Sequence, residues 1–274
     1  MKEVCVITGG GSGMGLAAAK ELGDEYQILI TGRTIEKLQA AVEDLKMKGI
    51  EAEGFPCDVS DRRAVEKLAE YASSMGNIKV VIHAAGLSPN MGSAETIMRI
   101  NAVGTVNVNE VFYGKVIQNG CIINVSSMSG HLVPKMVMPS KKYSLSTTNI
   151  ELFLKKMMNR VSLFPKKHQS GVSYSISKNF VIWYAQMHAE KFAERGIRVF
   201  SISPGLFETP MADAERELSQ GFVEKCAIKR YGRVEEIAYL FKVLSNEKAG
   251  YLTGIDILCD GGCIASGTKG LLKV

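Results

Sequence analysis

The feature that most constrains the fold is a repeated alternation between short apolar runs and longer stretches of helical periodicity. About seven runs rich in Val and Ile are apolar at nearly every position, whereas a half-exposed strand would be apolar at every second one. Such strands are buried on both faces, as in a parallel sheet covered by helices on each side. The pattern predicts the α/β class, with a doubly wound parallel sheet of about seven strands and right-handed crossovers.

The helices between the runs are expected over about 13–22, 34–48 and 62–75. No internal repeat, low-complexity tract or linker divides the chain. We therefore expect residues 1–274 to form a single domain of this doubly wound type, interrupted by an insertion over 131–170.

The insertion differs from the rest of the chain in charge. It holds eight Lys or Arg residues and one acid, whereas the other residues carry 25 basic and 27 acidic groups. Thr148 and Glu151 have the spacing of a capping box, and an apolar stripe follows from Ile150 to Val161. A basic amphipathic helix that ends before Pro165 is predicted.

Composition excludes several classes. The hydrophobic content of 46% is normal for a globular core, and no stretch approaches 18 uninterrupted apolar residues, so neither a membrane span nor a membrane partner is expected. The six cysteines lack a Cys-x-x-Cys pair or zinc spacing, which indicates free thiols, no metal site and a cytoplasmic protein. The basic excess lies in one segment without interleaved aromatic residues, so nucleic-acid binding is not expected.

A glycine-rich turn follows the first predicted strand and opens the first predicted helix. It reads Thr8-Gly9-Gly10-Gly11-Ser12-Gly13-Met14-Gly15. Glycines allow a tight turn and bring backbone N–H groups and the positive end of a helix close to a pyrophosphate. At the first strand-to-helix turn of a doubly wound sheet, this motif predicts a Rossmann-type dinucleotide site.

The end of the second predicted strand bears on the choice of dinucleotide. The acid that would accept the ribose 2′-hydroxyl of NAD is missing there, because Gly32 occupies the expected place and Arg33 follows it. A guanidinium holds a 2′-phosphate through charge-assisted hydrogen bonds. We therefore expect NADP in preference to NAD. The alternative is that Arg33 only stacks on the adenine, which would suit either cofactor.

Further motifs occur in a fixed order from the first strand to the terminal LTGIDILCDGG. They are TGGGSGMG, Asp58 in CDVS, Asn101 in NAVGT, Ser127 in NVSSMSG, Tyr174-x-x-x-Lys178 and SPGLFETP. With this series the chain resembles the short-chain dehydrogenase/reductase family over nearly its whole length. The spacing of Tyr174 and Lys178 would carry little weight without the other motifs.

The resemblance implies roles for individual residues. Asn101, Ser127, Tyr174 and Lys178 match the family's catalytic tetrad, and the resemblance favours Ser127 over its neighbour Ser126. The cofactor-binding positions that it implies are Gly9, Ser12, Gly13, Met14, Gly15, Arg33, Asp58, Val59, Ala85, Gly86, Tyr174, Lys178, Pro204, Gly205 and Thr209. Among these, Asp58 would touch the adenine and Thr209 would hold the nicotinamide carboxamide.

The pairing of Tyr174 with Lys178 also has a physical reason. Positions i and i+4 lie on one face of a helix, so the two side chains can meet. A free phenol, with a pKa near 10, is a poor base at neutral pH, and about 4 kcal/mol is needed to make it a useful one. An ammonium ~4 Å away contributes on the order of 4 kcal/mol in a partly desolvated site. Such a pair can carry the proton in a carbonyl reduction.

Two departures from the family pattern stand out. The chain has His83-Ala84-Ala85-Gly86 where the family usually has Asn-Asn-Ala-Gly, and we interpret His83 as a packed strand residue and not a catalyst. The gap from Ser127 to Tyr174 is 47 positions, much longer than the family's usual dozen, and the insertion accounts for the surplus. In this respect the chain is similar to a bacterial 3α-hydroxysteroid dehydrogenase/carbonyl reductase-like subgroup.

The resulting expectation is reversible hydride transfer between a nicotinamide cofactor and a secondary alcohol or ketone. The insertion follows the fifth strand, at the edge where ligands of such sheets bind, so it should flank the substrate site. Its apolar and basic residues would suit a carboxylated steroid, a fatty acyl thioester on a phosphate-bearing carrier, or simple packing on the body or a second subunit. A non-catalytic nucleotide sensor is the alternative from another class. The resemblance implies a homodimer or homotetramer.

Overall fold

The computed structural model describes residues 2–134, 136, 138–210 and 221–266, and it contains a seven-stranded sheet. The strands are β1 Val4–Thr8, β2 Gln27–Gly32, β3 Ala52–Pro56, β4 Ile78–His83, β5 Val116–Val125, β6 Arg198–Pro204 and β7 Asp256–Cys259. Every neighbouring pair is parallel, in the order β3-β2-β1-β4-β5-β6-β7. The expected α/β class and doubly wound sheet are confirmed.

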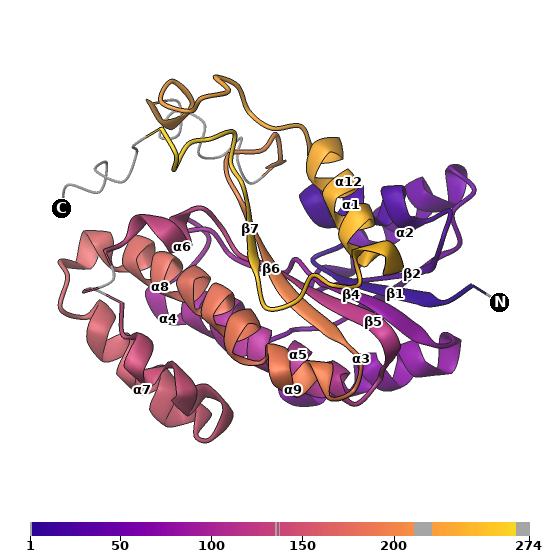
Figure 1. Ribbon diagram of the computed structural model, residues 1–274, viewed down its shortest axis with the longest axis horizontal. Helices are drawn as coiled ribbons and strands as arrows, with labels where there is room; N and C mark the ends of the chain where they lie inside the picture. The colour runs from indigo at the N-terminus through magenta and orange to yellow at the C-terminus, as the bar shows by residue number, and fades with distance from the viewer. Residues whose placement is uncertain (1, 135, 137, 211–220, 267–274) are drawn as a thin grey trace.

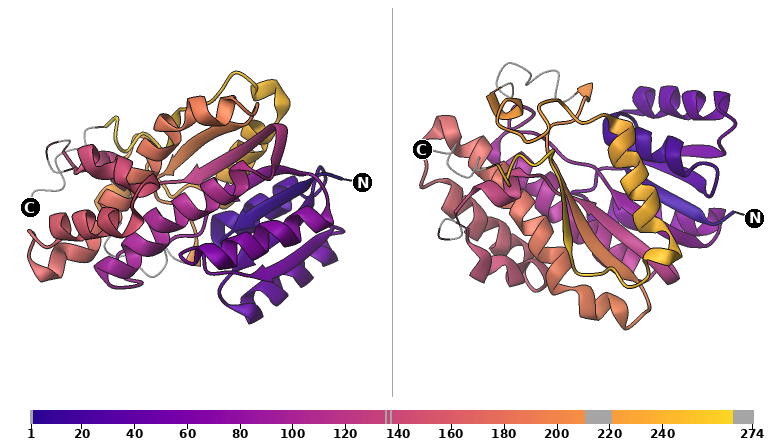
Figure 2. Two further views of the ribbon diagram at one scale, coloured as in Figure 1. Left: turned by 90° about the horizontal axis from the view of Figure 1, so that it is seen from below. Right: turned by 45° about the horizontal axis from the view of Figure 1, so that its top comes forward.

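Helices cover both faces of the sheet (Figures 1 and 2). They are α1 Gly13–Leu22, α2 Ile35–Met47, α3 Arg62–Met75, α4 Ala94–Met98, α5 Gly104–Tyr113, α6 Ser129–Leu132, α7 Ile150–Val161, α8 Lys166–Met187, α9 Ala189–Ala193 and α12 Val234–Ser245. A π-helical turn, Arg99–Val103, joins α4 to α5, and a 3₁₀ helix, Ser140–Thr147, precedes α7. The three helices predicted between the early strands agree with α1, α2 and α3 to within a residue at each end.

Two apolar cores lie on opposite faces of the sheet. One joins alternate residues of the strands to α1, α2 and α12, and the other joins the remaining strand residues to α3, α5, α8 and α9. Both faces of each central strand are thereby buried, which explains why the sequences of β1, β2 and β4 are apolar at most positions. The strand order reverses between β1 and β4, and this reversal opens the crevice where ligands of such folds bind.

The insertion forms the 3₁₀ helix and α7. Helix α7 lies beside α4 and α8 (Figure 1), and the 3₁₀ helix contacts α7 and α8. The apolar stripe of α7 is buried in a third core with residues of α8, including Phe180 and Tyr184. The predicted helix is therefore present, and its stripe is used for packing on the body of the protein.

The predicted capping box at the start of α7 is wrong by one residue. Asn149 is the N-cap, and its side-chain oxygen accepts a hydrogen bond from Leu152 N at 2.9 Å. The Thr148 hydroxyl instead donates back to Leu145 O at 3.5 Å, and Glu151 lies 3.9 Å from Arg99. Asn and Thr are both good N-caps, so the sequence offered two adjacent candidates, and the preceding 3₁₀ helix holds Thr148 in helical backbone geometry.

Candidate active site

The glycine-rich turn connects β1 to α1 at the carboxyl end of the sheet. Gly9 has a φ of +69° and Gly13 a φ of +54°, which glycine adopts at no steric cost. A Cβ on Gly15 would lie 2.5 Å from Gly9 O, so the helix can approach the turn only because this side chain is missing. Ser12 is the N-cap of α1 but its side chain makes no capping hydrogen bond. The helix therefore begins with N–H groups that can bind a pyrophosphate.

The positions expected to hold the adenosine end lie at the carboxyl ends of β2 and β3. These two strands pair, and Cys57 N donates to Gly32 O at 2.9 Å, so Arg33 and Asp58 lie at the same edge. The Asp58 carboxylate is fixed by Ser60, whose N and Oγ both donate to Oδ1 at 2.9 and 2.7 Å. Val59 follows as a buried residue.

Arg33 is exposed at this edge, and no ion pair involving it is found in the part of the chain that the structure describes. Lys37, near the start of α2, lies against the glycine-rich turn, because a Cβ on Gly11 would be 3.7 Å from Lys37 Cβ. Sequence reasoning missed Lys37. Its place in the first turn of the helix that follows Arg33 was the available signal.

The middle of the crevice is formed by the turn after β4. Ala85 N donates to Thr8 Oγ1 at 3.1 Å, and Gly9 lies so close that a Cβ on it would be 2.8 Å from Ala85 N. A Cβ on Gly86 would lie 3.2 Å from Asn101 Oδ1 and 3.3 Å from Lys178 Nζ. The glycine turn, the turn after β4 and the lysine of α8 are therefore contiguous.

The turn after β6 closes the other side. Pro204 ends β6, and Gly205 N donates to Cys259 O at 2.9 Å. A Cβ on Gly205 would lie 2.6 Å from the Asp260 Cα, and one on Gly13 would lie 3.5 Å from Thr209 Cγ2. Thr209 therefore faces the glycine turn across the crevice, although it is nearly 200 residues away in sequence.

Tyr174 and Lys178 lie on one face of α8. The Lys178 ammonium is 5.8 Å from the centre of the Tyr174 ring and donates to Val125 O, at the end of β5, at 2.9 Å. Lys178 is only 6% exposed, and burial lowers its pKa from 10.5 to about 8. A cation is thus held inside the protein directly beside the phenol.

Asn101 lies in the π-helical turn between α4 and α5, a kind of irregularity that is frequent at functional sites. Its side chain accepts from Leu87 N at 2.8 Å and donates to Leu87 O at 3.0 Å and to Ser177 Oγ at 3.2 Å. It therefore connects the turn after β4 to the helix that carries Tyr174 and Lys178. Sequence reasoning missed Ser177, which points to Asn101 from between those two residues.

Ser126 and Ser127 differ in what their hydroxyls do. The Ser126 hydroxyl donates to Lys178 O at 2.7 Å and so fastens α8 to the end of β5. Ser127 Oγ accepts from Ser129 N at 3.2 Å, which leaves its own O–H as a donor for a ligand. The arrangement supports Ser127 as the residue that meets a substrate oxygen.

His83 is buried between β1, β5 and Lys178. Thr8 Oγ1 accepts from Ala85 N at 3.1 Å and shares a hydrogen bond with His83 Nδ1, 2.8 Å away. Burial and, secondarily, the Lys178 charge lower the pKa of His83 to about 3, so the imidazole is neutral. The Thr8–His83 bond ties β1 to β4 at the position where the usual amide is missing.

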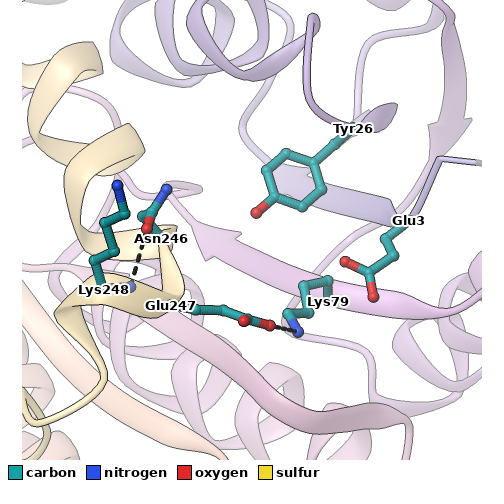
Figure 3. A pocket seen from close by; sticks show the side chains of 6 residues that line it. All are labelled: Glu3, Tyr26, Lys79, Asn246, Glu247 and Lys248. Atoms are coloured by element: carbon teal, nitrogen blue, oxygen red, sulfur yellow. Dashed lines mark hydrogen bonds and ion pairs between the residues drawn. The ribbon is translucent and has the colours of Figure 1, made fainter.

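A hollow of about 340 Å³ lies at the opposite, amino-terminal end of the sheet (Figure 3). It is lined by Glu3, Tyr26, Lys79, Asn246, Glu247 and Lys248. The Lys79 ammonium donates to Glu247 Oε1 at 2.6 Å across it. None of the predicted site residues lines this hollow, and ligands of doubly wound sheets bind at the other end.

The described residues contain neither a metal-binding cluster nor a membrane-spanning helix. Within the described residues no group of three or more His, Cys, Asp or Glu side chains could hold a metal ion. Among the helices that the structure describes, none combines the length and apolarity needed to cross a membrane.

The fold and the site define a class of protein. A doubly wound sheet with a glycine turn at its switch point and a tyrosine beside a buried lysine indicates an oxidoreductase that uses a nicotinamide dinucleotide. The chain matches the short chain dehydrogenase family over residues 3–164 and the enoyl-(acyl carrier protein) reductase description over 161–263. It belongs to the short-chain dehydrogenase/reductase family of enzymes.

Individual relatives agree with this assignment. The chain is 30% identical over 272 residues to the short-chain dehydrogenase/reductase bsc3 of Alternaria brassicicola, with 97% of each chain covered. It is 25% identical to the 3-oxoacyl-[acyl-carrier-protein] reductase FabG of Thermotoga maritima, covering 96% and 98% of the two chains. Among solved structures, a variant of actinorhodin polyketide ketoreductase with NADPH has a TM-score of 0.76 at 22% identity, covering 96% and 97%.

Proposed function

We propose that the protein reduces a ketone to a secondary alcohol, or catalyses the reverse reaction, with NADP(H) as cofactor. The observation that carries the proposal is the buried Lys178 ammonium beside Tyr174, contiguous through Gly86 with the glycine turn. Glycines without room for a Cβ and an uncapped α1 fit a dinucleotide along this crevice. When bound, the cofactor supplies or accepts the hydride.

The protein's own residues handle the proton. Ser127, with its O–H free, donates a hydrogen bond to the carbonyl oxygen of the substrate and orients it. Tyr174 gives its proton to that oxygen as the alcohol forms, and takes it back in the reverse direction. Lys178, held by Val125 O, stabilises the phenolate that is left and contacts the ribose.

Asn101 supports this proton transfer. Its side chain is occupied by Leu87 and Ser177, but its backbone carbonyl, which accepts from Thr105 Oγ1 at 2.7 Å, has a second lone pair. We assign to that carbonyl a water that passes protons between solvent and Lys178.

The direct test is Tyr174→Phe, which removes only the hydroxyl. Loss of the general acid should lower kcat by 10²–10⁴-fold for any ketone that the wild type reduces. Cofactor affinity, measured by fluorescence titration with NADPH, should change little. Turnover within tenfold of wild type, with cofactor binding intact, would show that another group carries the proton.

The preference for NADP rests on Arg33 and Lys37. Both cations lie at the carboxyl edge beside the glycine turn, where an acid would stand in an NAD site. The ketoreductase with a similar fold was solved with NADPH. The KM for NADP should therefore be lower than that for NAD, and Arg33→Ala and Lys37→Ala should each raise it about tenfold while leaving the KM for NAD nearly unchanged. A clear preference of the wild type for NAD would refute this assignment.

The substrate that we propose is a hydroxysteroid or its ketone, with a carboxylated, bile-acid-like steroid as the leading candidate. The insertion supports this through its exposed lysines, such as Lys141 and Lys142, which can attract an acidic group. The buried stripe of α7 gives no support, because Met157 packs on α8 instead of facing a ligand. The FabG relative supports the alternative, a 3-oxoacyl thioester.

A panel of carboxylated steroids, uncharged steroids and 3-oxoacyl thioesters separates these substrates. The steroid assignment requires the highest kcat/KM on the carboxylated steroids and a decrease with added salt. Equal kcat/KM on charged and uncharged steroids without a salt effect would refute charge selection. The highest kcat/KM on the acyl thioesters would replace the steroid assignment.

We also propose a homodimer or homotetramer that forms along the outer strand. β7 is at the edge of the sheet, and Leu258 on it and Tyr239 and Val243 on α12 are exposed apolar residues, the last two 63% and 42% exposed. Burying them against a second copy is favourable. Light scattering should give a mass of two or four chains, and Tyr239→Glu with Val243→Glu should reduce it. A monomeric wild type would refute the proposal.

A cytoplasmic location is consistent with the cysteines. None of the six, all of which lie in the described part of the chain, forms a disulfide, and five of them are buried. Cysteines remain outside disulfides in reducing compartments. Fractionation of the producing cells tests this location, and recovery of the protein outside the cytoplasm would contradict it.

A further inference from the structure

The insertion lies between two of the residues proposed for catalysis, Ser127 and Tyr174. Ser127 precedes it and Tyr174 follows it, so any distortion of the inserted segment could change the distance between them. Tyr143, in the 3₁₀ helix of the insertion, is fully buried against α8. Its ring packs edge-on against Phe180 and Trp183, with centroids 5.3 and 5.4 Å away. An aromatic ring held on two sides fixes its hydroxyl in one place.

That hydroxyl is directed at Asn179, the residue after Lys178. Tyr143 OH donates to Asn179 Oδ1 at 3.1 Å, with Ile176 O further away at 3.4 Å and Met138 Sδ at 3.8 Å. The other end of the amide, Asn179 Nδ2, donates to Gly130 O at 2.9 Å. Because only the oxygen of a side-chain amide accepts and only its nitrogen donates, Tyr143 OH and Gly130 O together fix which way the Asn179 amide faces.

Gly130 connects this chain of bonds to Ser127. A Cβ on Gly130 would lie 3.0 Å from Asn179 N and from Lys178 C, so α6 is pressed directly on the backbone of α8. Gly130 N donates to Ser127 O at 2.9 Å, and Ser129 N donates to Ser127 Oγ. A displacement of Gly130 would therefore move the Ser127 hydroxyl.

We propose that Tyr143 is a positioning residue, whose hydroxyl sets the spacing between Ser127 and Tyr174 by way of Asn179 and Gly130. The proposal rests on the function proposed above and adds to it a role for the insertion. Burial raises the pKa of the Tyr143 phenol, so it stays a donor throughout the working range of the enzyme. The insertion lengthens the sequence separation between Ser127 and Tyr174. It also supplies the hydrogen bond that fixes the distance between these two residues in space.

The experiment compares Tyr143→Phe with a matched control, Tyr184→Phe. Tyr184 is also fully buried on α8 in the same core, but its hydroxyl donates to Glu110 Oε1, away from Ser127. Loss of positioning should lower kcat about tenfold in Tyr143→Phe, with the KM for NADPH unchanged. Tyr184→Phe should retain the kcat of the wild type. In the double variant with Asn179→Leu, Tyr143→Phe should cause no further loss, because both act through one path.

A kcat of Tyr143→Phe within threefold of wild type, or an equal loss in both tyrosine variants, overturns the proposal. A second measurement does not depend on activity. Hydrogen exchange of the amides of residues 126–131 should be faster in Tyr143→Phe than in Tyr184→Phe, and equal rates overturn the proposal. If the wild type reduces no ketone in the panel, the proposed function fails, and the exchange rates alone decide whether Tyr143 holds the turn.

Discussion

Replacing Lys178 by Met should change the stability of the protein in a way that depends on pH. The lysine is buried, and its pKa falls from 10.5 to about 8 because burial penalises the charged form. This difference corresponds to about 3 kcal/mol that folding spends at neutral pH to keep the ammonium inside. Methionine fills a similar volume without a charge, so Lys178→Met removes this cost.

The sign follows from proton binding. Below pH 8 both the folded and the unfolded protein carry the proton on Lys178, so the full penalty applies. Between pH 8 and 10.5 the unfolded state binds more protons, and this residue makes the wild type more stable as pH rises. Of the penalty of about 3 kcal/mol, about 2 kcal/mol should be relieved between pH 7 and 9.5. The free energy of unfolding of Lys178→Met should show no such rise with pH, because methionine does not titrate.

The assay is urea unfolding of both proteins without cofactor at pH 7, 8, 9 and 9.5. Subtracting the two free energies of unfolding cancels every other titrating group, and the advantage of the variant should shrink by about 2 kcal/mol over this range. The variant also leaves Val125 O without its donor, which costs about 1–3 kcal/mol at every pH. The pH dependence is therefore the test. A difference that stays constant within about 0.5 kcal/mol would refute the reasoning, since this would mean that Lys178 is not a desolvated cation.

Three further predictions concern the same region. Gly86→Ala should lower kcat at least about tenfold in steady-state assays, because the new methyl group would crowd Asn101 Oδ1 and Lys178 Nζ, and unchanged turnover would contradict the contiguous crevice. Phe153→Ala should reduce the free energy of unfolding in urea by about 3–5 kcal/mol, since the ring is fully buried, and a loss below about 1 kcal/mol would mean that α7 does not pack on the body. Asn149→Ala should cost about 1 kcal/mol in the same assay and Thr148→Ala less than about 0.5, and the reverse order would reinstate Thr148 as the cap.

Much of the fold could be predicted from sequence because its signals are local. Most strands contain a short apolar run, and the turn from β1 to α1 carries its glycines within eight residues. The sequence pattern predicted the parallel, doubly wound class, whereas the order of the strands comes from the structure. The cap of α7 was missed because Asn149 and Thr148 are chemically similar neighbours, and the choice between them depends on the 3₁₀ helix that precedes them.

In the candidate site, too, contacts between residues close in sequence could be predicted, whereas contacts between distant residues could not. Tyr174 and Lys178 are one helical turn apart, so their meeting follows from helix geometry. Asn179, by contrast, forms hydrogen bonds with Tyr143, 36 positions away, and with Gly130, 49 positions away. Neither partner belongs to a sequence motif that would have indicated the contact. Thr8 likewise binds His83 across 75 positions. Such contacts depend on the packing of whole elements, which a sequence pattern does not show.

The packing of the insertion on α8 explains how this helix can keep the charged Lys178 side chain buried. Lys178 lowers the stability of α8 in its buried place by about 3 kcal/mol, and a helix free to tilt would let the ammonium reach water. Phe153 and Met157 of α7 are fully buried in the core that they share with α8, and each contributes about 1.5–3 kcal/mol by leaving water. Those gains offset the cost of the cation, and they act on the same helix. The packing of α7 on α8 therefore compensates for the cost of burying Lys178 in the same helix.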